Sequence, residues 1–371
     1  MRLVNKSGLT AYAYVTGFDP VANELWPPPG FLDKNGEWQY LAMPKSNLEP
    51  VVPPSLALQP DASIDIPLTP ISSGRVWFSL GDPLQFFVNT PVGQDPRPSL
   101  AQPDWLNGSD VNIAKKWTFC EFTYDASSGL YVNISYVDLT ALPISLELTG
   151  TNTGQVPGLP SGALDRMATA LNLQQERDGA PWGKLVARNP EGQCLRISAP
   201  HFSKFDFTGY WSSYVSDVWS NYERRPLSID IQDGSAPYQG LVRNGLLVFA
   251  KSGASDPGAF SMPSSADIFG CNSGPFENEG SAVRKAIAAR IGAAFNRATL
   301  LLPTGDTQPD GVPVSGYYQN ETCNHYARIV HEYTKVGYAF SYDDVLPVGV
   351  PAVDGHLADP NPQELVISVS I

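Results

Sequence analysis

Residues 117–138 read Trp117-Thr-Phe-Cys-Glu121-Phe-Thr-Tyr-Asp125-Ala-Ser-Ser-Gly129-Leu-Tyr131-Val-Asn-Ile-Ser-Tyr136-Val-Asp138. Two runs of aromatic and β-branched residues flank Ser128-Gly129, and this pattern predicts a β-hairpin with a two-residue turn. Such a turn pairs Ser127 with Leu130 and places Glu121 opposite Tyr136. Asp138 is then the diagonal neighbour of Glu121 on the same face, ~7–8 Å away at the backbone.

Two carboxyl groups near this separation suit hydrolysis of a glycosidic bond with inversion, which needs them ~6.5–9.5 Å apart. Trp117 and Phe119 lie on the face of Glu121, so partial desolvation is expected to favour its protonated form as the general acid. Asp138, beside a turn, is expected to be wetter and ionised as the base. A two-residue slip of the turn would open the gap to ~13 Å. The alternative is that both are solvated residues on an ordinary sheet face.

The composition limits the classes of partner. The chain has 371 residues, with 32 glycines, 34 prolines and a formal net charge of −13 at pH 7. The length favours two domains, and the turn-forming residues favour a loop-rich β protein. The negative charge disfavours nucleic acid and anionic membranes and is compatible with an uncharged polymer such as a polysaccharide. No apolar run approaches the ~18 residues of a membrane span.

The location is predicted from three weak signals. The first five residues lead into a polar segment and contain no apolar signal core, which fits either a cytosolic protein or a secreted one whose leader has been removed. We favour secretion. Two disulfides in three possible pairings are open to the cysteines, and four Asn-X-Ser/Thr sequons are present. These residues are Cys120, Cys194, Cys271 and Cys323, and Asn5, Asn107, Asn133 and Asn320.

The pattern of elements predicts a mainly β protein with an inserted α/β domain. Residues 1–155 contain short strand-like runs between Pro- and Gly-rich turns, which is typical of a sandwich or barrel. Residues 156–312 predict helices at 161–177, 207–223 and 279–301, with strands at 183–187, 228–231 and 245–249. Residues 313–371 predict a helix at 321–333 and then a return to the β domain through strands at 337–342 and 364–371.

The hairpin and its continuation resemble the thaumatin-like proteins. That group carries a strand ending in Glu-Phe-Thr, a Tyr-x-Val/Ile-Ser strand, an Asp-containing turn and an apolar-Pro pair. The matching residues are Glu121-Phe122-Thr123, Tyr131-Val132-Asn133-Ile134-Ser135, Asp138 and Leu142-Pro143. Residues 337–344, Gly-Tyr-Ala-Phe-Ser-Tyr-Asp-Asp, are similar to the Tyr-Ala-Tyr-Asp-Asp segment of the same group.

The chain is larger than a thaumatin and has fewer cysteines, and in this combination it resembles glycoside hydrolase family 64, the β-1,3-glucanases. Residues 121–138 and the run Asn324-His-Tyr-Ala-Arg-Ile-Val-His-Glu332 match that family. The resemblance implies a thaumatin-like β-sandwich or barrel, an inserted α/β domain and an open groove between them. It also implies an enzyme that cleaves β-1,3-glucan (laminarin, curdlan-like) with inversion and releases short laminari-oligosaccharides, typically laminaripentaose.

The resemblance also implies site residues. The essential glutamate and aspartate of the family fall on Glu121 and Asp138. Two further acidic positions fall on Asp110 and Asp344. Sugar-lining positions fall on Thr123 and Asp125, although the family can carry an amide at the latter, and an aromatic a few residues later falls on Leu130 here. Tyr136, predicted opposite Glu121, completes the expected substrate-binding set.

Several of these residues have a plain structural interpretation. Asp343 and Asp344 are adjacent, so in a strand at most one faces the groove. Asp110, in Asn-Gly-Ser-Asp, is equally a turn residue. The aromatic run at 205–222 predicts a core stripe of Phe207, Tyr210, Tyr214 and Val218, with Trp211 and Trp219 left as candidates for stacking on sugar rings.

No cofactor or metal site is predicted. His325, Arg328 and His331 lie on one predicted helix, but histidines six apart fall on different faces, and the zinc-protease motif is missing. Cys120 should point away from Glu121. We therefore expect a monomer that binds β-1,3-glucan and laminari-oligosaccharides. The alternatives are a non-catalytic thaumatin-like glucan-binding or defence protein, and a glycosidase acting on another β-glucan linkage.

Overall fold

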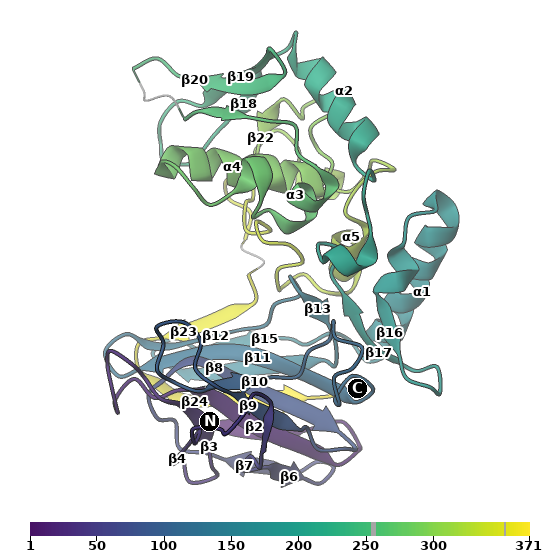
Figure 1. Cartoon of the computed structure of the whole chain (residues 1–371). Helices are drawn as coiled ribbons and strands as arrows, with labels where there is room; N and C mark the ends of the chain where they lie inside the picture. The colour runs from purple at the N-terminus through teal and green to yellow at the C-terminus, as the bar shows by residue number, and fades with distance from the viewer. Residues whose placement is uncertain (254–256, 352–353) are drawn as a thin grey trace.

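The computed structural model describes residues 1–253, 257–351 and 354–371. A β-rich part lies at one end of the molecule and a mixed α/β part at the other, with α1 (Ala163–Asp178) and α5 (His325–Tyr333) beside the region where they meet (Figure 1). Both ends of the described chain lie in the β-rich part. Among the described residues, no helix is long and apolar enough to cross a membrane.

The largest sheet of the β-rich part contains the predicted hairpin. Its strand order is β23-β12-β11-β8-β2-β3-β4, and β6 also pairs with β2. The strands are β2 (Ala11–Phe18), β3 (Pro29–Leu32), β4 (Trp38–Tyr40), β6 (Leu56–Leu58), β8 (Ile71–Leu80), β11 (Lys116–Asp125), β12 (Gly129–Asn133) and β23 (His356–Asp359).

Side chains alternate between the two faces of this sheet, and both faces are buried over most of its length. On β8, Val76 and Phe78 join the main core, whereas Trp77 lies in a second aromatic cluster with Trp117 and Phe86. The second cluster is covered by a small sheet of β5 (Glu49–Val51), β9 (Phe86–Asn89) and β10 (Ser99–Ala101).

A second sheet packs on the main-core face and makes the β-rich part a sandwich. Its order is β15-β14-β24-β1-β7, and β1 runs parallel to β24, which joins the two ends of the chain. Its strands are β1 (Arg2–Asn5), β7 (Ser63–Asp65), β14 (Ile144–Gly150), β15 (Gly154–Val156) and β24 (Pro362–Val369). The described strands form separate sheets rather than a closed barrel.

The α/β part is built on a five-stranded sheet of order β21-β20-β19-β18-β22. The predicted helix at 279–301 is confirmed as α4, whose stripe of Ile287, Ile291 and Phe295 is buried. The elements are β18 (Leu227–Ile229), β19 (Tyr238–Arg243), β20 (Leu246–Ala250), β21 (Ala259–Phe260), β22 (Thr307–Gln308), α2 (Ser212–Tyr222), α3 (Ser265–Gly270) and α4 (Ala282–Asn296).

A three-stranded sheet connects the two parts directly after the hairpin. β13 (Leu139–Thr140) pairs with β17 (Cys194–Ser198), which pairs with β16 (Val186–Arg188). One continuous cluster of buried apolar residues extends from the sandwich through α1 into the α/β part. The segment that contains Asp138 is therefore held by both parts of the molecule. The domain boundaries at 155 and 312 stay a prediction.

Two secondary-structure predictions are wrong. Residues 337–342 form bends and turns rather than a strand. The predicted strand at 183–187 is largely the short 3-10 helix Trp182–Leu185, and β16 begins only at Val186. Helices α1, α2 and α5 confirm the predictions at 161–177, 207–223 and 321–333, with shorter bounds. The short helix α3 was missed, although Ser264 and Asp267 form the capping box that marks its start.

All four cysteines are free and buried in the described structure, so no disulfide pairing is present there. Burial raises the pKa of the Cys120 thiol to about 12. The side chain alternates with Glu121 on β11 and packs in the main core. Cys120 therefore lies on the opposite face from Glu121, as predicted.

Candidate active site

The hairpin differs from the prediction in its register. β11 pairs with β12 so that Asp125 faces Gly129 and Glu121 faces Asn133. The turn therefore contains the three residues 126–128. The Asp125 Oδ1 atom accepts hydrogen bonds from the backbone N–H groups of Ser127 (2.7 Å) and Ser128 (3.0 Å). Gly129 follows with φ +87°, which is typical of a three-residue hairpin loop that ends in a glycine bulge.

This register removes Tyr136 from the substrate-binding set. β12 ends at Asn133, so Tyr136 does not face Glu121. Its side chain is 6% exposed and belongs to the main core, and its backbone N–H donates to the carbonyl oxygen of Tyr338 at 2.8 Å. The prediction for Tyr136 is wrong because the loop is one residue longer and the chain leaves the sheet before this position.

Glu121 and Asp138 nevertheless come together. Both line a small hollow of about 40 Å³, the carboxylate hollow, whose wall also contains Phe119, Cys120, Asn133, Ser135 and Leu139. After β12 the chain turns, and the carbonyl oxygen of Asp138 accepts a hydrogen bond from the backbone N–H of Ala199 at 2.8 Å. The next residue, Leu139, pairs with Ser198. Asp138 thus reaches Glu121 through the connecting sheet rather than along the hairpin.

Arg75 pairs with Glu121 across the sheet. The two residues are direct neighbours of β8 and β11, and the Arg75 Nε and Nη2 atoms donate to Glu121 Oε1 at 3.0 and 2.8 Å. The Arg75 guanidinium lies 4.7 Å from the ring centre of Phe119 and also donates to Gln102. The Glu121 side chain remains 46% exposed. Its carboxylate is therefore charge-paired on one oxygen and open to solvent.

Asp138 has a different set of neighbours. Burial raises the pKa of its carboxyl group, His201 opposes that shift, and the charge of Glu121 adds to it. The His201 Nε2 atom lies 3.5 Å from Asp138 Oδ1, and the Asp138 side chain is 52% exposed. The two carboxyl side chains are thus similarly exposed. Exposure does not separate an acid from a base in the way the sequence predicted.

Four residues that sequence reasoning missed share the face of Glu121. Arg75, Glu121, Asn133 and His356 are consecutive partners across four strands. Two residues further along β12, the Tyr131 ring is 48% exposed and stacks on His356, with ring centres 5.1 Å apart and an interplanar angle of 19°. The strict alternation of Tyr131 with its buried neighbours was the available signal. Leu130, where the family aromatic was expected, is 2% exposed and faces the core.

Thr123 and Asp125 lie further along β11. Thr123 is exposed, two residues from Glu121 on the same face, and pairs with Tyr131. Asp125 shapes the hairpin turn, and the hydrogen bonds from Ser127 and Ser128 lower the pKa of its carboxyl group. Thr123 therefore lies on the same sheet face as Glu121 without lining the carboxylate hollow, whereas the described contacts of Asp125 lie within the turn.

Asp110 is engaged in a local turn. Its Oδ2 atom accepts from the backbone N–H of Asp104 at 3.0 Å, and its Oδ1 atom accepts from that of Asn112 at 2.7 Å. These contacts match the turn interpretation that its sequence context left open. Asp110 does not line the carboxylate hollow.

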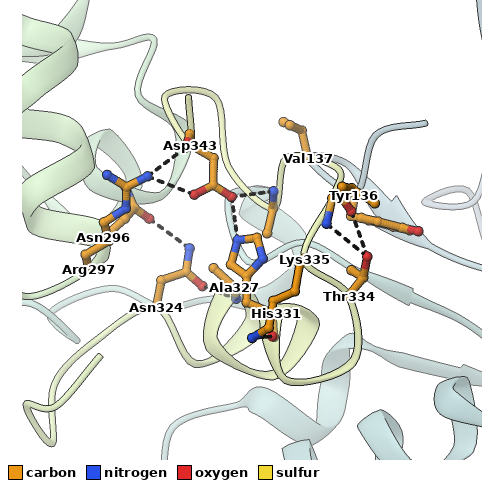
Figure 2. Close-up of polar contacts among 12 residues, drawn as sticks. Tyr136, Val137, Asn296, Arg297, Asn324, Ala327, His331, Thr334, Lys335 and Asp343 are labelled. Carbon is orange, nitrogen blue, oxygen red and sulfur yellow. Dashed lines mark hydrogen bonds and ion pairs between the residues drawn. The ribbon is translucent and has the colours of Figure 1, made fainter. Parts of the chain in front are cut away.

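Asp343 and Asp344 lie in a turn, and only one of them is exposed. Figure 2 shows Asp343 between Arg297 and His331, which contact it at 3.0 and 2.6 Å. Asp344 is exposed, and burial followed by the charge of Asp344 raises the pKa of Tyr338. Asp344 is not among the residues that line the carboxylate hollow.

A larger cavity of about 440 Å³ lies beside Asp343 and is lined by Tyr317, Tyr318 and Lys335 among others. Only one of its two carboxylates is open to solvent, because Asp343 pairs with Arg297 and its side chain is 3% exposed, whereas the Glu332 side chain is 48% exposed. Chemistry on a neutral sugar needs carboxyl groups that a substrate can reach. We therefore place the candidate active site at the carboxylate hollow rather than at this larger cavity.

The aromatic run at 205–222 is core. Trp211 and Trp219 are 0% and 3% exposed, so the candidates for sugar stacking in this run are wrong. Trp211 is buried together with the helical stripe, because its ring packs on those of Tyr214 and Phe269 at the start of α2. Among the described residues, no group of three histidine, cysteine, aspartate or glutamate side chains is arranged to hold a metal ion.

The sequence is similar to known β-1,3-glucanases. Residues 1–369 match the family model of glycoside hydrolase family 64, described as "Beta-1,3-glucanase". Glucan endo-1,3-beta-glucosidases from Cellulosimicrobium cellulans and Arthrobacter sp. (strain YCWD3) are each 30% identical over 313 residues, which is 81% of this chain and 52% of theirs. The chain thus spans about half the length of these curated relatives.

Solved structures share the fold. A laminaripentaose-producing beta-1,3-glucanase in complex with laminaritetraose superposes with a TM-score of 0.82 at 24% identity, covering 100% of this chain and 98% of that one. A beta-1,3-glucanase domain from Clostridium beijerinckii gives a TM-score of 0.72 at 23% identity, with the same coverage. At these identities the likeness supports the arrangement of the two parts.

Proposed function

We propose that this chain, which belongs to glycoside hydrolase family 64, the beta-1,3-glucanases, hydrolyses β-1,3-glucan with inversion and releases short laminari-oligosaccharides. The observation that carries the proposal is the pair of half-exposed carboxyl groups, Glu121 and Asp138, in one hollow on an open sheet face. Laminarin and curdlan are the substrates of choice for testing it.

The proposed reaction uses the two carboxyl groups on opposite sides of a glucosyl ring. One donates its proton to the glycosidic oxygen as the bond to the anomeric carbon breaks, and the other removes a proton from the water that attacks from the opposite face. The products carry the inverted, α configuration at the new reducing end. The open face around Thr123 and Tyr131 supplies a surface for the glucan on the same side as Glu121.

The sequence assigned the acid to Glu121 and the base to Asp138. That assignment requires substrate binding to weaken the contact between Arg75 and Glu121, because a guanidinium stabilises the ionised carboxyl group. The reverse assignment requires no such change. A substrate with a good leaving group separates them, because loss of the acid is then partly compensated, whereas loss of the base is not.

Reducing-sugar release from laminarin tests the proposal. Glu121→Gln and Asp138→Asn should each lower kcat by about 10²–10⁴-fold, while binding to insoluble glucan persists. Asp65→Asn is the matched control, since Asp65 pairs with Arg2 on a distant exposed surface. Early product should be the α-anomer by NMR. Near-normal turnover in either active-site variant, or a β-anomer, would overturn the mechanism.

The alternatives predict other outcomes. A non-catalytic glucan-binding protein would bind insoluble β-1,3-glucan and release no sugar from it. A glycosidase of another specificity would be active on a different member of a β-glucan panel. Having both carboxyl groups exposed in one hollow favours the enzyme over the binding protein.

We also propose that the protein acts outside the cell as a monomer. Support comes from the substrate class, because an extended polysaccharide is met outside the membrane. Detection of the native protein in the medium after fractionation, and light scattering coupled to gel filtration, test the two points. Retention in the cytosol or a stable oligomer would contradict them.

A further inference from the structure

A third titratable side chain lies at the edge of the carboxylate hollow. His201 follows β17 and places its Nε2 atom 3.5 Å from Asp138 Oδ1. The His201 side chain is 19% exposed, against 52% for that of Asp138. The contact joins a residue of the hairpin's continuation to a turn that leads into the α/β part.

The backbone fixes both partners of this contact. Ala199, two residues before His201, donates its N–H to the carbonyl oxygen of Asp138 at 2.8 Å, and Ser198 pairs with Leu139. The His201 ring packs on that of Phe202, with centres 3.9 Å apart. The two segments therefore cannot separate without breaking the connecting sheet.

His201 also lines a second cavity, of about 230 Å³, on the side of the α/β part. Its wall includes Phe202, Asp206, Thr208 and Ser264. One imidazole therefore borders both this cavity and the Asp138 carboxyl group.

The charged groups around the pair are few. Asp138 interacts with His201, Glu121 and Arg75, and His201 interacts with Asp138. Glu121 is already paired with Arg75 at 2.8 Å, so it competes weakly for the imidazole. His201 is therefore the titratable side chain that is left to pair with Asp138.

We propose that His201 is a positioning residue of the acid–base pair, which holds the Asp138 carboxyl group towards Glu121 and sets its proton occupancy. The consequence for turnover rests on the proposed glucanase reaction, whereas the pairing itself does not. Such a coupling arises when two titratable groups of opposite charge type lie within a few ångströms in a partly desolvated site.

The electrostatics agree with this geometry. Burial lowers the pKa of His201 and Asp138 raises it, whereas burial raises the pKa of Asp138 and His201 lowers it. Burial therefore brings the pKa of the His201 imidazole and that of the Asp138 carboxyl group closer together. Removing either partner should therefore move the other in a known direction.

NMR titration of the imidazoles tests the pairing without any need for activity. The chain has four histidines, so each resonance can be assigned by substitution. Asp138→Asn should lower the pKa of His201 by about 0.5–1 unit, because the raising influence is lost. Asp354→Asn is the matched control, since Asp354 contacts a different histidine, His356, at 2.6 Å and its removal should leave the pKa of His201 unchanged. An unchanged His201 in Asp138→Asn overturns the pairing.

Kinetics test the positioning role. His201→Phe keeps a planar ring without charge or donor, and should lower kcat about tenfold with KM within about twofold. The limb of the pH–rate profile that Asp138 governs should move to higher pH by about 0.5–1 unit, since the influence that lowers the pKa of Asp138 is gone. His201→Gln should recover most of kcat but show the same displaced limb.

The two failures are distinguishable. If the wild-type protein releases no sugar from any β-glucan, the proposed reaction fails while the NMR titration still decides the pairing. If wild type is active and His201→Phe leaves both kcat and the pH profile unchanged, the positioning role is wrong. A loss of kcat with an unmoved profile would reduce His201 to a packing residue and would also contradict the inference.

Discussion

Two clusters that each combine an arginine, a carboxylate and a histidine, one around Asp343 and one around Glu121 and Asp138, differ in how completely the carboxylates are satisfied. In the buried network, Asp343 accepts from Arg297 at 3.0 Å, from the backbone N–H of Ala339 at 2.9 Å, and contacts His331 at 2.6 Å. Its side chain is 3% exposed. In the open site, two carboxylates share the same kinds of partner and remain about half exposed.

The difference in exposure separates a cluster that stabilises the fold from one that can take part in a reaction. A buried carboxylate that is bonded on both oxygens is out of reach of a substrate, and its partners would be left unpaired if it were removed. Glu121 has one oxygen outside the Arg75 contact, and His201 approaches Asp138 only to 3.5 Å. The open site is thus incompletely satisfied at both acids, which is what a site that must bind and transfer protons requires.

The largest expected effect on stability comes from breaking the buried network. Asp343→Asn removes the charge that compensates Arg297, whose side chain is 3% exposed, and should cost about 3–5 kcal/mol. Urea unfolding at pH 7 measures it. Asp306→Asn is the matched control, because Asp306 pairs with the half-exposed Arg225 and should cost ~1 kcal/mol or less. Equal losses would remove the distinction between buried and open clusters.

The same network should give stability a pH dependence. Burial alone would raise the pKa of Asp343, but His331 and Arg297 outweigh it, so the pKa lies below its ordinary value. Such a group adds stability above the unfolded pKa of ~3.9, and the gain is lost as the pH falls through the folded value. The difference in unfolding free energy between wild type and Asp343→Asn should therefore narrow below about pH 4. A difference that stays constant from pH 7 to 3 would contradict this.

The next effect concerns the segment that presents Asp138. The Tyr326 hydroxyl, on α5, donates to the carbonyl oxygen of Tyr136 at 2.6 Å and lies 2.9 Å from Thr140 Oγ1, so it brackets Asp138 from both sides. Tyr326→Phe leaves a buried carbonyl unsatisfied and should cost about 1–3 kcal/mol. It should also lower kcat about tenfold with little change in KM, because the carboxyl group is displaced.

A matched variant separates stability from positioning. The buried Tyr222 hydroxyl donates to the carbonyl oxygens of Leu300 at 2.7 Å and Gly305 at 3.1 Å, within the α/β part. Tyr222→Phe should lose similar stability and keep kcat. If both variants lose activity in proportion to stability, Tyr326 does not position Asp138.

The open site also shows how far sequence reasoning reaches. The apolar periodicity of α4 and the alternation in β11 are local signals, and they correctly predicted a helix and the face that carries Glu121. The turn was misplaced because Ser128-Gly129 competed with Asp125, whose side chain caps the loop two and three residues on. That signal was present in the sequence and was outweighed by the stronger turn dipeptide.

The proximity of Asp138 to Glu121 was predicted for the wrong reason. The hairpin register does not bring the two together. Asp138 is instead held near Glu121 by contacts that Ala199 and Tyr326, both distant in sequence, make with residues 136–138. Arg75 and His201 come from other strands and turns, so no pattern within the hairpin indicates them. Long-range pairing is the part of a site that local periodicity does not encode.

The smallest effect concerns the open face, where one exposed aromatic should contribute to binding alone. Tyr131 is 48% exposed and is fixed by stacking on His356, so it offers a flat surface for a glucosyl ring on the side of Glu121. Tyr131→Ala should raise KM for laminari-oligosaccharides about fivefold, equivalent to ~1 kcal/mol, with kcat within twofold. Tyr131→Phe should behave as wild type, since the ring face is retained.

Tyr40 provides the comparison for that measurement. It is 50% exposed and lies on β4, at the opposite edge of the same sheet from β23. Tyr40→Ala removes an equally exposed ring and should leave KM unchanged, because its surface is remote from the carboxylate hollow. A rise in KM for both variants would mean that general loss of sheet stability, rather than stacking beside Glu121, weakens binding. A rise for Tyr131→Ala alone would extend the open site from its two acids to the neighbouring strand.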